Sequence, residues 1–333
     1  MSKWFVTGGN GFIGTNLVAL LSGGAGSTQQ PANKITVYDS APITAAGHIS
    51  ALKQAAEAGG VGSEINCITG DILDRAALQQ AMAGADYVVH LAASSDVSAS
   101  VRDPFFDHQN NVVGTLNTLH AASTAGVKRF VFASSSAPLA NATPPIHEEM
   151  AADLGNPYAA GKLAGEAYCQ AFSQCYGLQT TVLRFSNVFG PYSDRASGVI
   201  PTFIRNAIAG KPVEIYGDGS ATRDFIHVSD ICAVIVKAAL DQRPSKGAIF
   251  HVATKTETSI REIASLVADV MRARGINPPE LVFKPERVGD VPRSYSENTK
   301  ARHFFDWEPR EKLESDVEEL VAWFLSMTSV NRI

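Results

Sequence analysis

A tyrosine and a lysine, Tyr158 and Lys162, form the pattern Y-x-x-x-K in a stretch whose residues predict a helix over 158–176. Helical residues four apart share one face, so the phenol and the ammonium should lie side by side. A nearby ammonium stabilises the phenolate and lowers the pKa of the tyrosine toward neutrality, as a catalytic base requires. The same spacing also fits an ordinary pair on a helix surface, so its meaning depends on the elements around it.

Three consecutive serines, Ser134 to Ser136, come at the end of an apolar run that predicts a strand over 130–134. In a doubly wound sheet, ligands bind beyond the carboxyl ends of the strands. A serine hydroxyl at this position is placed to hydrogen-bond a substrate oxygen on the carbon that loses hydride. The alternative is that the serines only end the strand and solvate a turn.

A glycine-rich turn near the amino terminus supplies the expected partner of this chemistry. An apolar strand over 3–7 leads into Gly8, Gly11 and Gly14, and an apolar helical pattern starts at Phe12. Backbone without Cβ atoms turns tightly and brings N–H groups at the positive end of a helix against a pyrophosphate. The third glycine lets the helix pack closely on the strand. The spacing G-x-x-G-x-x-G, between strand and helix, favours dinucleotide binding of the short-chain dehydrogenase type over a plain turn.

An acidic residue supports the choice of dinucleotide. Residues 35–39 predict a second buried strand with Asp39 at its carboxyl end. A carboxylate there accepts hydrogen bonds from the ribose hydroxyls of adenosine and repels a 2′-phosphate, so NAD is favoured over NADP. An aspartate at a strand end is also a normal turn residue.

The composition of the chain excludes several classes of protein. The 333 residues carry 18% charged residues and a formal net charge of -5, which leaves no basic surface for nucleic acid. The four cysteines have no metal-ligand spacing and are typical of reduced thiols in a cytoplasmic protein, and we expect no metal site. No apolar run reaches the length of a membrane span, and no signal peptide precedes the first strand.

Strand and helix patterns alternate through the first half and predict an α/β protein with a doubly wound parallel Rossmann sheet. Further strands are expected over 65–69, 87–91, 130–134 and 180–184, with helices over 74–82, 106–125 and 158–176. After Asn187, proline and glycine punctuate shorter elements, which indicates a smaller interleaved substrate domain closed by an amphipathic helix near 313–324. The expected domains are 1–186 with a returning segment near 226–252, and 187–225 together with 253–333.

Ordered motifs along nearly the whole chain resemble the extended short-chain dehydrogenase/reductases, specifically the NAD-dependent nucleotide-sugar epimerase/dehydratase family. The matching segments are 7–14 (TGGNGFIG), 70–72 (GDI), 90–93 (HLAA), 110–115 (NNVVGT), the set Ser136, Tyr158 and Lys162, 183–191 (LRFSNVFGP), 217–230 (GDGSATRDFIHVSD) and 287–290 (RVGD).

This resemblance implies roles for particular residues. Asp71 and Ile72 would contact adenine, Ala92 and Ala93 the diphosphate and ribose of the cofactor, and Asn110 would lie near the nicotinamide. Asn187 would touch the phosphates of a nucleotide sugar, and Arg223 and Arg287 would clamp its diphosphate, since guanidinium groups bind phosphate oxygens bidentately. The expected cofactor residues are completed by Gly8, Gly11, Phe12, Ile13, Gly14, Asp39, Leu91, Tyr158, Lys162 and Phe185, and the expected substrate residues by Ser95, Ser136, Asp290 and Ser294.

The residues that flank the motifs separate the reactions of the family. The resemblance implies an acidic pair directly after the Ser/Thr in 4,6-dehydratases, where this chain has Ala137 and Pro138, and an arginine after the lysine in decarboxylases, where it has Leu163. With dehydration and decarboxylation disfavoured, the reaction of the family that we expect is epimerisation at C4 of a UDP-hexose through a 4-keto intermediate. The open alternatives are a reductase of a 4-keto nucleotide sugar and a protein that binds NAD(H) without catalysis.

Two departures from the family pattern concern specificity. Residues 139–141 read Leu-Ala-Asn where the relatives usually continue toward Val-Tyr-Gly, and Ser294 falls where some epimerases carry a bulky tyrosine. A small residue there would leave space for a sugar substituent such as an N-acetyl group. The family also implies a homodimer through the helices over 106–125 and 158–176.

Overall fold

A computed structural model describes residues 1–23, 32–45, 47–58, 63–286, 291–310 and 312–330. The chain divides into two compact units, each built from separate segments. The first unit holds 1–138, 152–184 and 232–250, and the second holds 139–151, 185–231 and 251–333. The sequence-based boundaries placed 139–151 and 226–231 in the first domain, whereas contacts group both stretches with the second unit.

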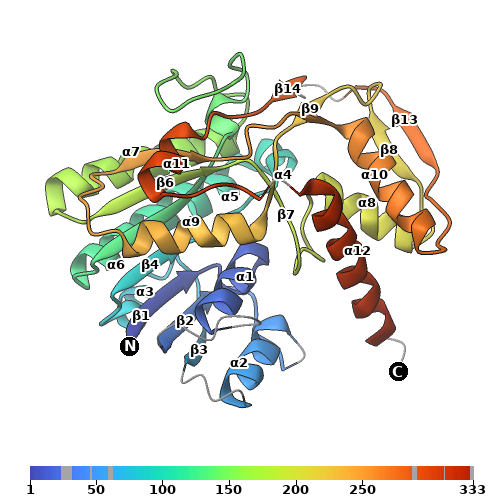
Figure 1. Ribbon diagram of the computed structural model, residues 1–333. Helices are drawn as coiled ribbons and strands as arrows, with labels where there is room; N and C mark the ends of the chain where they lie inside the picture. Colours follow the sequence, from blue (N-terminus) through green and yellow to red (C-terminus); the bar gives the residue numbers. More distant parts are fainter. Residues whose placement is uncertain (24–31, 46, 59–62, 287–290, 311, 331–333) are drawn as a thin grey trace. The chain divides into compact units, whose positions relative to one another are not determined.

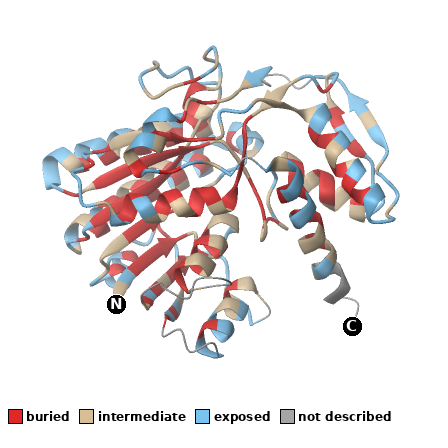
Figure 2. Ribbon diagram, in the orientation of Figure 1, coloured by how far each residue is buried: buried red, intermediate tan, exposed pale blue. Residues whose placement is uncertain are grey.

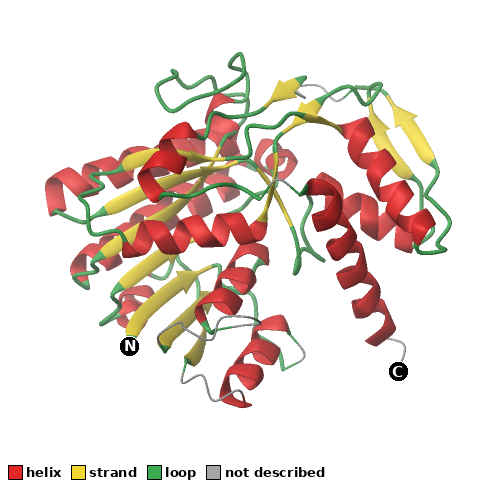
Figure 3. Cartoon of the chain, viewed as in Figure 1, coloured by secondary structure: helices red, strands yellow, loops and turns green. Residues whose placement is uncertain are grey.

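The central feature of the first unit is a seven-stranded sheet, which makes the protein an α/β fold as predicted (Figures 1 and 3). Its order, β11-β6-β5-β4-β1-β2-β3, is that of a doubly wound sheet, and the registers of β3-β2-β1-β4-β5 are parallel. The order reverses between β1 and β4, and ligands of such sheets bind outside the strand ends at this point. The strands are β1 (Ser2–Thr7), β2 (Asn33–Asp39), β3 (Glu64–Thr69), β4 (Tyr87–His90), β5 (Arg129–Ser135), β6 (Thr180–Phe185) and β11 (Ala248–Val252).

The strands of this sheet are apolar and mostly buried (Figure 2), because helices cover both faces. Helices α3, α6 and α7 pack on one face around Phe130, Phe132 and Leu119, and α1 and α9 lie on the other (Figure 1). The helices of the unit are α1 (Phe12–Leu21), α2 (His48–Ala58), α3 (Arg75–Met82), α4 (Val97–Arg102), α5 (Pro104–His108), α6 (Gly114–Thr124), α7 (Pro157–Tyr176) and most of α9 (Val228–Leu240), with a short 3₁₀ turn over Ala137–Leu139.

The helix expected over 106–125 is interrupted. It begins earlier, at Pro104, and a π-helical turn over Gln109–Val113 separates α5 from α6. Such turns widen the helix locally and are frequent at functional sites. The caps follow their sequence signals, since Asp74 accepts a hydrogen bond from the Ala77 N–H at the start of α3 and Asp103 caps α5 in the same way.

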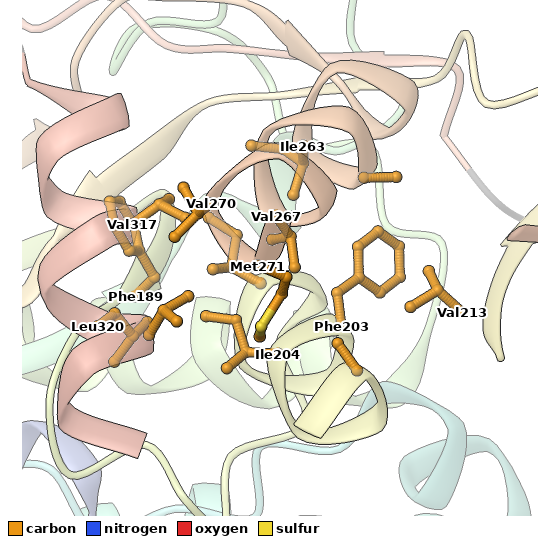
Figure 4. Close-up of a cluster of buried hydrophobic side chains, with 14 of the residues drawn as sticks. Phe189, Phe203, Ile204, Val213, Ile263, Val267, Val270, Met271, Val317 and Leu320 are labelled. Carbon is orange, nitrogen blue, oxygen red and sulfur yellow. The ribbon is translucent and has the colours of Figure 1, made fainter. Parts of the chain in front are cut away.

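The second unit has its own core between α8, α10 and α12 (Figure 4), where Phe203, Val267 and Leu320 are buried. Along α10 the apolar residues recur at helical spacing, and Ser259 forms a capping box with Glu262 at its start. Its elements are β7 (Asn187–Phe189), α8 (Val199–Ile208), β8 (Val213–Tyr216), β9 (Thr222–Arg223), β10 (Phe225–His227), β12 (Thr258–Ser259), α10 (Ile260–Ala273), β13 (Leu281–Lys284), β14 (Arg293–Ser294), α11 (Thr299–Phe305) and α12 (Leu313–Val330). Within the described ranges, no helix combines the length and apolarity that crossing a bilayer requires.

Candidate active site

The glycine-rich turn between β1 and α1 forms a cradle that side chains would fill. Gly8 has a φ of +67°, and a Cβ there would lie 2.6 Å from the backbone nitrogen of Ala92. A Cβ on Gly14 would lie 2.4 Å from the Gly8 carbonyl oxygen. Gly11 is the N-cap of α1 and provides no side-chain cap, so the first N–H groups of this helix keep their capacity for an anion. This backbone fits the pyrophosphate of a dinucleotide.

Asp39 lies at the end of β2, next to this turn. Its carboxylate accepts hydrogen bonds from the backbone N–H of Asn10 (2.9 Å) and of Ala41 (2.9 Å), which fixes it beside the glycine-rich loop. Asp71 lies two residues beyond the end of the next strand, β3, and its carboxylate accepts the Leu73 N–H in the turn that follows. Ile72 is buried against α6. The structure therefore brings the three residues expected at the adenosine to the carboxyl ends of β2 and β3.

Of the three consecutive serines, Ser135 is the one that contacts Tyr158. The Ser135 side chain hydrogen-bonds Tyr158, and the Ser135 Oγ also accepts the N–H of Ala137 at 3.1 Å. Ser135 is the last residue of β5, whereas Ser136 lies beyond the end of the strand. We therefore propose Ser135 for the serine role that the family motif gives to Ser136.

With Ser135 in place of Ser136, the two residues that follow the serine, where dehydratases carry an acidic pair, are also different. The residues directly after Ser135 are Ser136 and Ala137, in place of the Ala137 and Pro138 considered above. Neither Ser136 nor Ala137 is a carboxylic acid, so the argument against dehydration is unchanged.

Tyr158 is the second residue of α7 and is held there by its surroundings. Its backbone N–H donates to the Ser100 Oγ at 3.3 Å, and Asn156 caps the helix through the Ala159 N–H. Burial raises the pKa of Tyr158, the hydrogen bond from Ser135 lowers it, and the charge of Asp107 raises it. The expected lowering is thus outweighed by desolvation in this structure.

Lys162 is buried and lies one turn further along α7. Its ammonium donates to the Ala133 carbonyl oxygen at 2.8 Å and lies 5.8 Å from the centroid of the Tyr158 ring. Burial lowers the pKa of Lys162 to about 8, against the opposing effects of Asp107 and Glu166. An ammonium has three donors, so this group can hold backbone and ligand oxygens together.

The buried His90, at the end of β4, hydrogen-bonds side chains of β1 and α6. His90 lies between the hydroxyls of Thr7 (Nδ1–Oγ1 2.7 Å) and Thr115 (Nε2–Oγ1 3.0 Å). Thr115 donates its own proton to the Asn111 carbonyl, so it accepts from Nε2, and Nδ1 accepts from Thr7. Burial lowers the pKa of His90 to about 3, which keeps the ring neutral.

Asn111 is the asparagine that faces the loop after β4. It accepts the Ser94 N–H at 2.9 Å and donates to the Ser94 carbonyl at 2.9 Å. The Asn110 side chain, which the resemblance placed near the nicotinamide, instead donates back to the Phe106 carbonyl of its own helix. Asp107 was not identified from the sequence, and Asn111 was read only as part of the motif over 110–115, without a role of its own.

The remaining predicted residues of the first unit lie as follows. Phe12 and Ile13 begin α1, Leu91, Ala92 and Ala93 follow β4 beside the glycine-rich turn, and Ser95 is exposed in the same loop. The Leu91 N–H donates to the Thr7 carbonyl, which ties this loop to the end of β1.

Several predicted substrate residues lie together in the second unit. Arg223 in β9 is the register partner of Ser294 in β14, and its guanidinium donates to the Val291 carbonyl at 2.7 Å. The Asn187 N–H donates to the Asp224 carbonyl, one residue after Arg223. Phe185 also belongs to this unit and is buried. Arg287 and Asp290 lie outside the described residues.

Comparison with known proteins shows which family shares this fold and these motifs. The family model of the NAD dependent epimerase/dehydratase family matches residues 4–253. A UDP-glucose 4-epimerase of Mycolicibacterium smegmatis is 37% identical over 243 residues, which cover 72% of this chain and 76% of the relative. A dTDP-glucose 4,6-dehydratase of Streptomyces niveus is 31% identical over 324 residues, or 96% of this chain and 91% of the relative. The solved UDP-glucose 4-epimerase of Thermotoga maritima with UDP-glucose superimposes with a TM-score of 0.84 at 29% identity, covering 98% and 99% of the two chains.

The doubly wound sheet, the glycine-rich turn and the Tyr158–Lys162 helix define a dehydrogenase/reductase of the short-chain type. The chain belongs to the NAD-dependent epimerase/dehydratase family, as its family match over residues 4–253 shows, and NAD is the cofactor of that family. Because the relatives include both epimerases and dehydratases, the reaction has to be argued from the site.

Proposed function

We propose that this protein is a nucleotide-sugar 4-epimerase that inverts C4 of a UDP-hexose through a transient 4-keto sugar. The observation that carries the proposal is the set Ser135, Tyr158 and Lys162, followed by Ser136 and Ala137 in place of an acidic pair. Removal of water across C5 and C6 needs an acid and a base beyond the tyrosine, and the positions after Ser135 provide neither.

The proposed mechanism assigns each residue a task. Bound NAD, held by the glycine-rich turn and Asp39, would supply the hydride acceptor and donor for C4. Tyr158 takes the O4 proton and later gives it back, while Ser135 hydrogen-bonds both the phenol and the substrate oxygen. Lys162 stabilises the phenolate by its charge. The overall reaction is redox-neutral, so no cofactor is consumed and NAD remains bound through turnover.

Recognition of the nucleotide sugar is proposed for the second unit. Arg223 and Arg287 would hold the diphosphate, with Asn187 beside its oxygens and Asp290 nearby. The small side chain of Ser294, the register partner of Arg223 in β14, favours a pocket with room for a substituent on the sugar. The candidate sugars are therefore UDP-glucose and UDP-galactose and their N-acetyl and uronic forms.

We further propose a homodimer formed by the first unit. The side chains of Val101, Phe105 and Phe106 on α4 and α5 are 62%, 83% and 58% exposed. Large apolar side chains grouped at one surface of a soluble protein typically mark an interface. A second copy of this chain is the proposed occupant, and a cytoplasmic location, suggested by the free cysteines, stays a prediction.

The direct test is incubation of the purified protein with UDP-galactose deuterated at C4, without added cofactor, followed by NMR. The parallel substrates are UDP-N-acetylglucosamine and UDP-glucuronate. An epimerase gives the C4 epimer with deuterium retained at C4, because the same hydride leaves and returns. Loss of the C4 label with stoichiometric reduction of NAD, in a parallel sample to which NAD is added, would identify a 4-keto reductase running in its oxidative direction, and a 4-keto-6-deoxy product would identify a dehydratase. Either result would overturn the proposal.

A further inference from the structure

The buried ammonium of Lys162 needs a countercharge, since an ion removed from water is stable only when it is paired. Two carboxylates act on it, those of Asp107 and Glu166. They come from different helices, because Glu166 is one turn further along α7 and Asp107 is on α5. Both carboxylates are buried, with 1% of each residue exposed.

Glu166 is already neutralised by another cation. Its two carboxylate oxygens accept hydrogen bonds from Arg184, at 2.8 Å from Nε and 2.7 Å from Nη2. The Ser134 hydroxyl donates to the same carboxylate at 2.6 Å. A bidentate pair of this kind offsets much of the charge of the carboxylate, and Glu166 raises the pKa of Lys162 less than Asp107 does.

Asp107 has a neutral partner instead. Its Oδ1 accepts the side-chain amide of Asn111 at 2.8 Å, which satisfies a lone pair but brings no positive charge. Its Oδ2 faces α7 closely, since a Cβ built on Gly161 would lie 3.3 Å from that oxygen. Gly161 directly precedes Lys162, and the missing side chain therefore lets the carboxylate approach the helix turn that carries the ammonium.

We propose, building on the proposed epimerase function, that Asp107 is a positioning residue whose buried carboxylate is the countercharge that keeps Lys162 protonated beside Tyr158. The contacts of the two carboxylates support this, because Glu166 pairs with Arg184, whereas Asp107 accepts the neutral amide of Asn111 and acts on Lys162 more strongly than Glu166 does. Asn111 has the second task of holding the carboxylate toward α7 while it anchors the Ser94 loop.

The groups around Lys162 fix the direction of the expected pH effect. Tyr158 and Glu166 face it from α7, Asp107 from α5, the neutral His90 from β4, and the Phe132 ring of β5 lies 5.1 Å from its ammonium. Removing the Asp107 charge lowers the pKa of Lys162, which Asp107 raises, and lowers that of Tyr158, which it also raises. Both limbs of a bell-shaped rate profile should therefore move to lower pH.

The test compares three variants by two measurements. Asp107→Asn removes the charge at nearly constant shape, Asp107→Glu keeps the charge and changes the shape, and Asp103→Asn removes an exposed charge from the cap of the same helix. The first measurement is NMR titration of ¹³Cε-labelled lysine, with the Lys162 signal assigned by its loss in Lys162→Arg. The second is the pH profile of kcat/KM for epimerisation.

Asp107→Asn should lower the titration midpoint of Lys162, and both limbs of the profile, by about one pH unit. Asp107→Glu and Asp103→Asn should stay close to the unsubstituted protein. A normal Lys162 midpoint in Asp107→Asn, or greater damage from Asp107→Glu than from Asp107→Asn, would overturn the proposal and leave a role in packing.

The unsubstituted protein gives a check that needs no variant. If its Lys162 titrates well below pH 7, then Asp107 does not keep the ammonium charged. The NMR titration does not depend on turnover, so failure of the proposed reaction would show only in the absence of product.

Discussion

Ser134 and Ser135 are neighbours on β5 whose hydroxyls serve different partners. Ser134 donates to the buried carboxylate of Glu166 at 2.6 Å, and Ser135 hydrogen-bonds Tyr158. The alternation of side chains along a strand separates them. Ser134 therefore contacts the buried carboxylate of Glu166, and Ser135 contacts the tyrosine that we propose as the catalytic base.

The contact of Ser135 with Tyr158 predicts different effects of alanine substitution at Ser135 and at Ser136, its neighbour on the other side. Ser135→Ala should lower kcat of epimerisation by about 10²-fold, because it removes a hydrogen bond to Tyr158 and to the substrate oxygen. Ser136→Ala, the matched control, should change kcat by less than about threefold. Steady-state kinetics on both variants measures this. A larger loss in Ser136→Ala would return the catalytic role to that residue.

Removal of the phenol hydroxyl tests the proposed base. Tyr158→Phe should lower kcat by about 10³-fold, in the range of general acid–base catalysis, and should leave NAD bound. The measurements are turnover and the NAD content of the purified protein after denaturation. Turnover equal to that of the unsubstituted protein would exclude Tyr158 as the base.

The close contact of the third glycine predicts a binding defect. A Cβ on Gly14 would lie 2.4 Å from the Gly8 carbonyl, so Gly14→Ala must displace the turn that is proposed to hold the pyrophosphate. We expect at least a tenfold loss of NAD affinity, measured by calorimetry or by retained NAD. Gly198→Ala, where the nearest atom is 3.5 Å away and φ is -61°, is the control and should retain its NAD.

His90 predicts a loss of stability in acid. Burial lowers the pKa of His90 to about 3, from 6.5, so the unfolded chain binds a proton between these values and the folded protein does not. The free energy of unfolding should therefore fall as the pH drops from 6.5 toward 3, by about 1.4 kcal/mol per pH unit for this group.

The neutral variant His90→Gln isolates that contribution. Denaturant unfolding at several pH values between 4 and 7.5 should show a shallower decline in the variant than in the unsubstituted protein. Taking the difference between the two proteins removes the effects of other groups, such as His227, whose pKa burial also lowers, to about 4. Equal slopes would mean that His90 already accepts a proton in the folded protein.

The exposed apolar side chains on α5 predict an effect on assembly. Phe105→Asp should convert the proposed dimer to a monomer, because it places a charge in an interface that buries apolar surface. Light scattering after size-exclusion chromatography measures the mass. Phe283→Asp is the control, since Phe283 is also exposed, at 51%, but belongs to the second unit. A monomer before any substitution would contradict the dimer.

The sequence predicted most of what short-range physics controls. Apolar runs gave six strands of the central sheet to within about two residues, whereas β11 was not predicted as a strand, and the helix expected over 74–82 begins at Arg75, after its N-cap Asp74. The glycine-rich turn could be read because only glycine tolerates the contacts that Gly8 and Gly14 make.

The sequence could not resolve features that depend on register or on long-range contact. Ser135 and Ser136 have the same chemistry, and only the point at which β5 ends, after Ser135, distinguishes them. Asn110 and Asn111 are likewise neighbours of one type, and the π-helical turn over Gln109–Val113 decides which of them faces the Ser94 loop. The segment 139–151 follows a strand of the first unit but packs with the second, which its local pattern does not reveal.

The position of β11 in the sheet has a consequence for the nascent chain. This strand pairs with β6 at one edge of the sheet, yet its residues, Ala248–Val252, emerge from the ribosome about seventy residues after β6. Until then, β6 is an open edge with unpaired N–H and C=O groups, the kind of surface that invites pairing between chains. Synthesis of the intervening segment therefore sets a period of exposure during which crowding or chaperone supply governs the yield of folded protein.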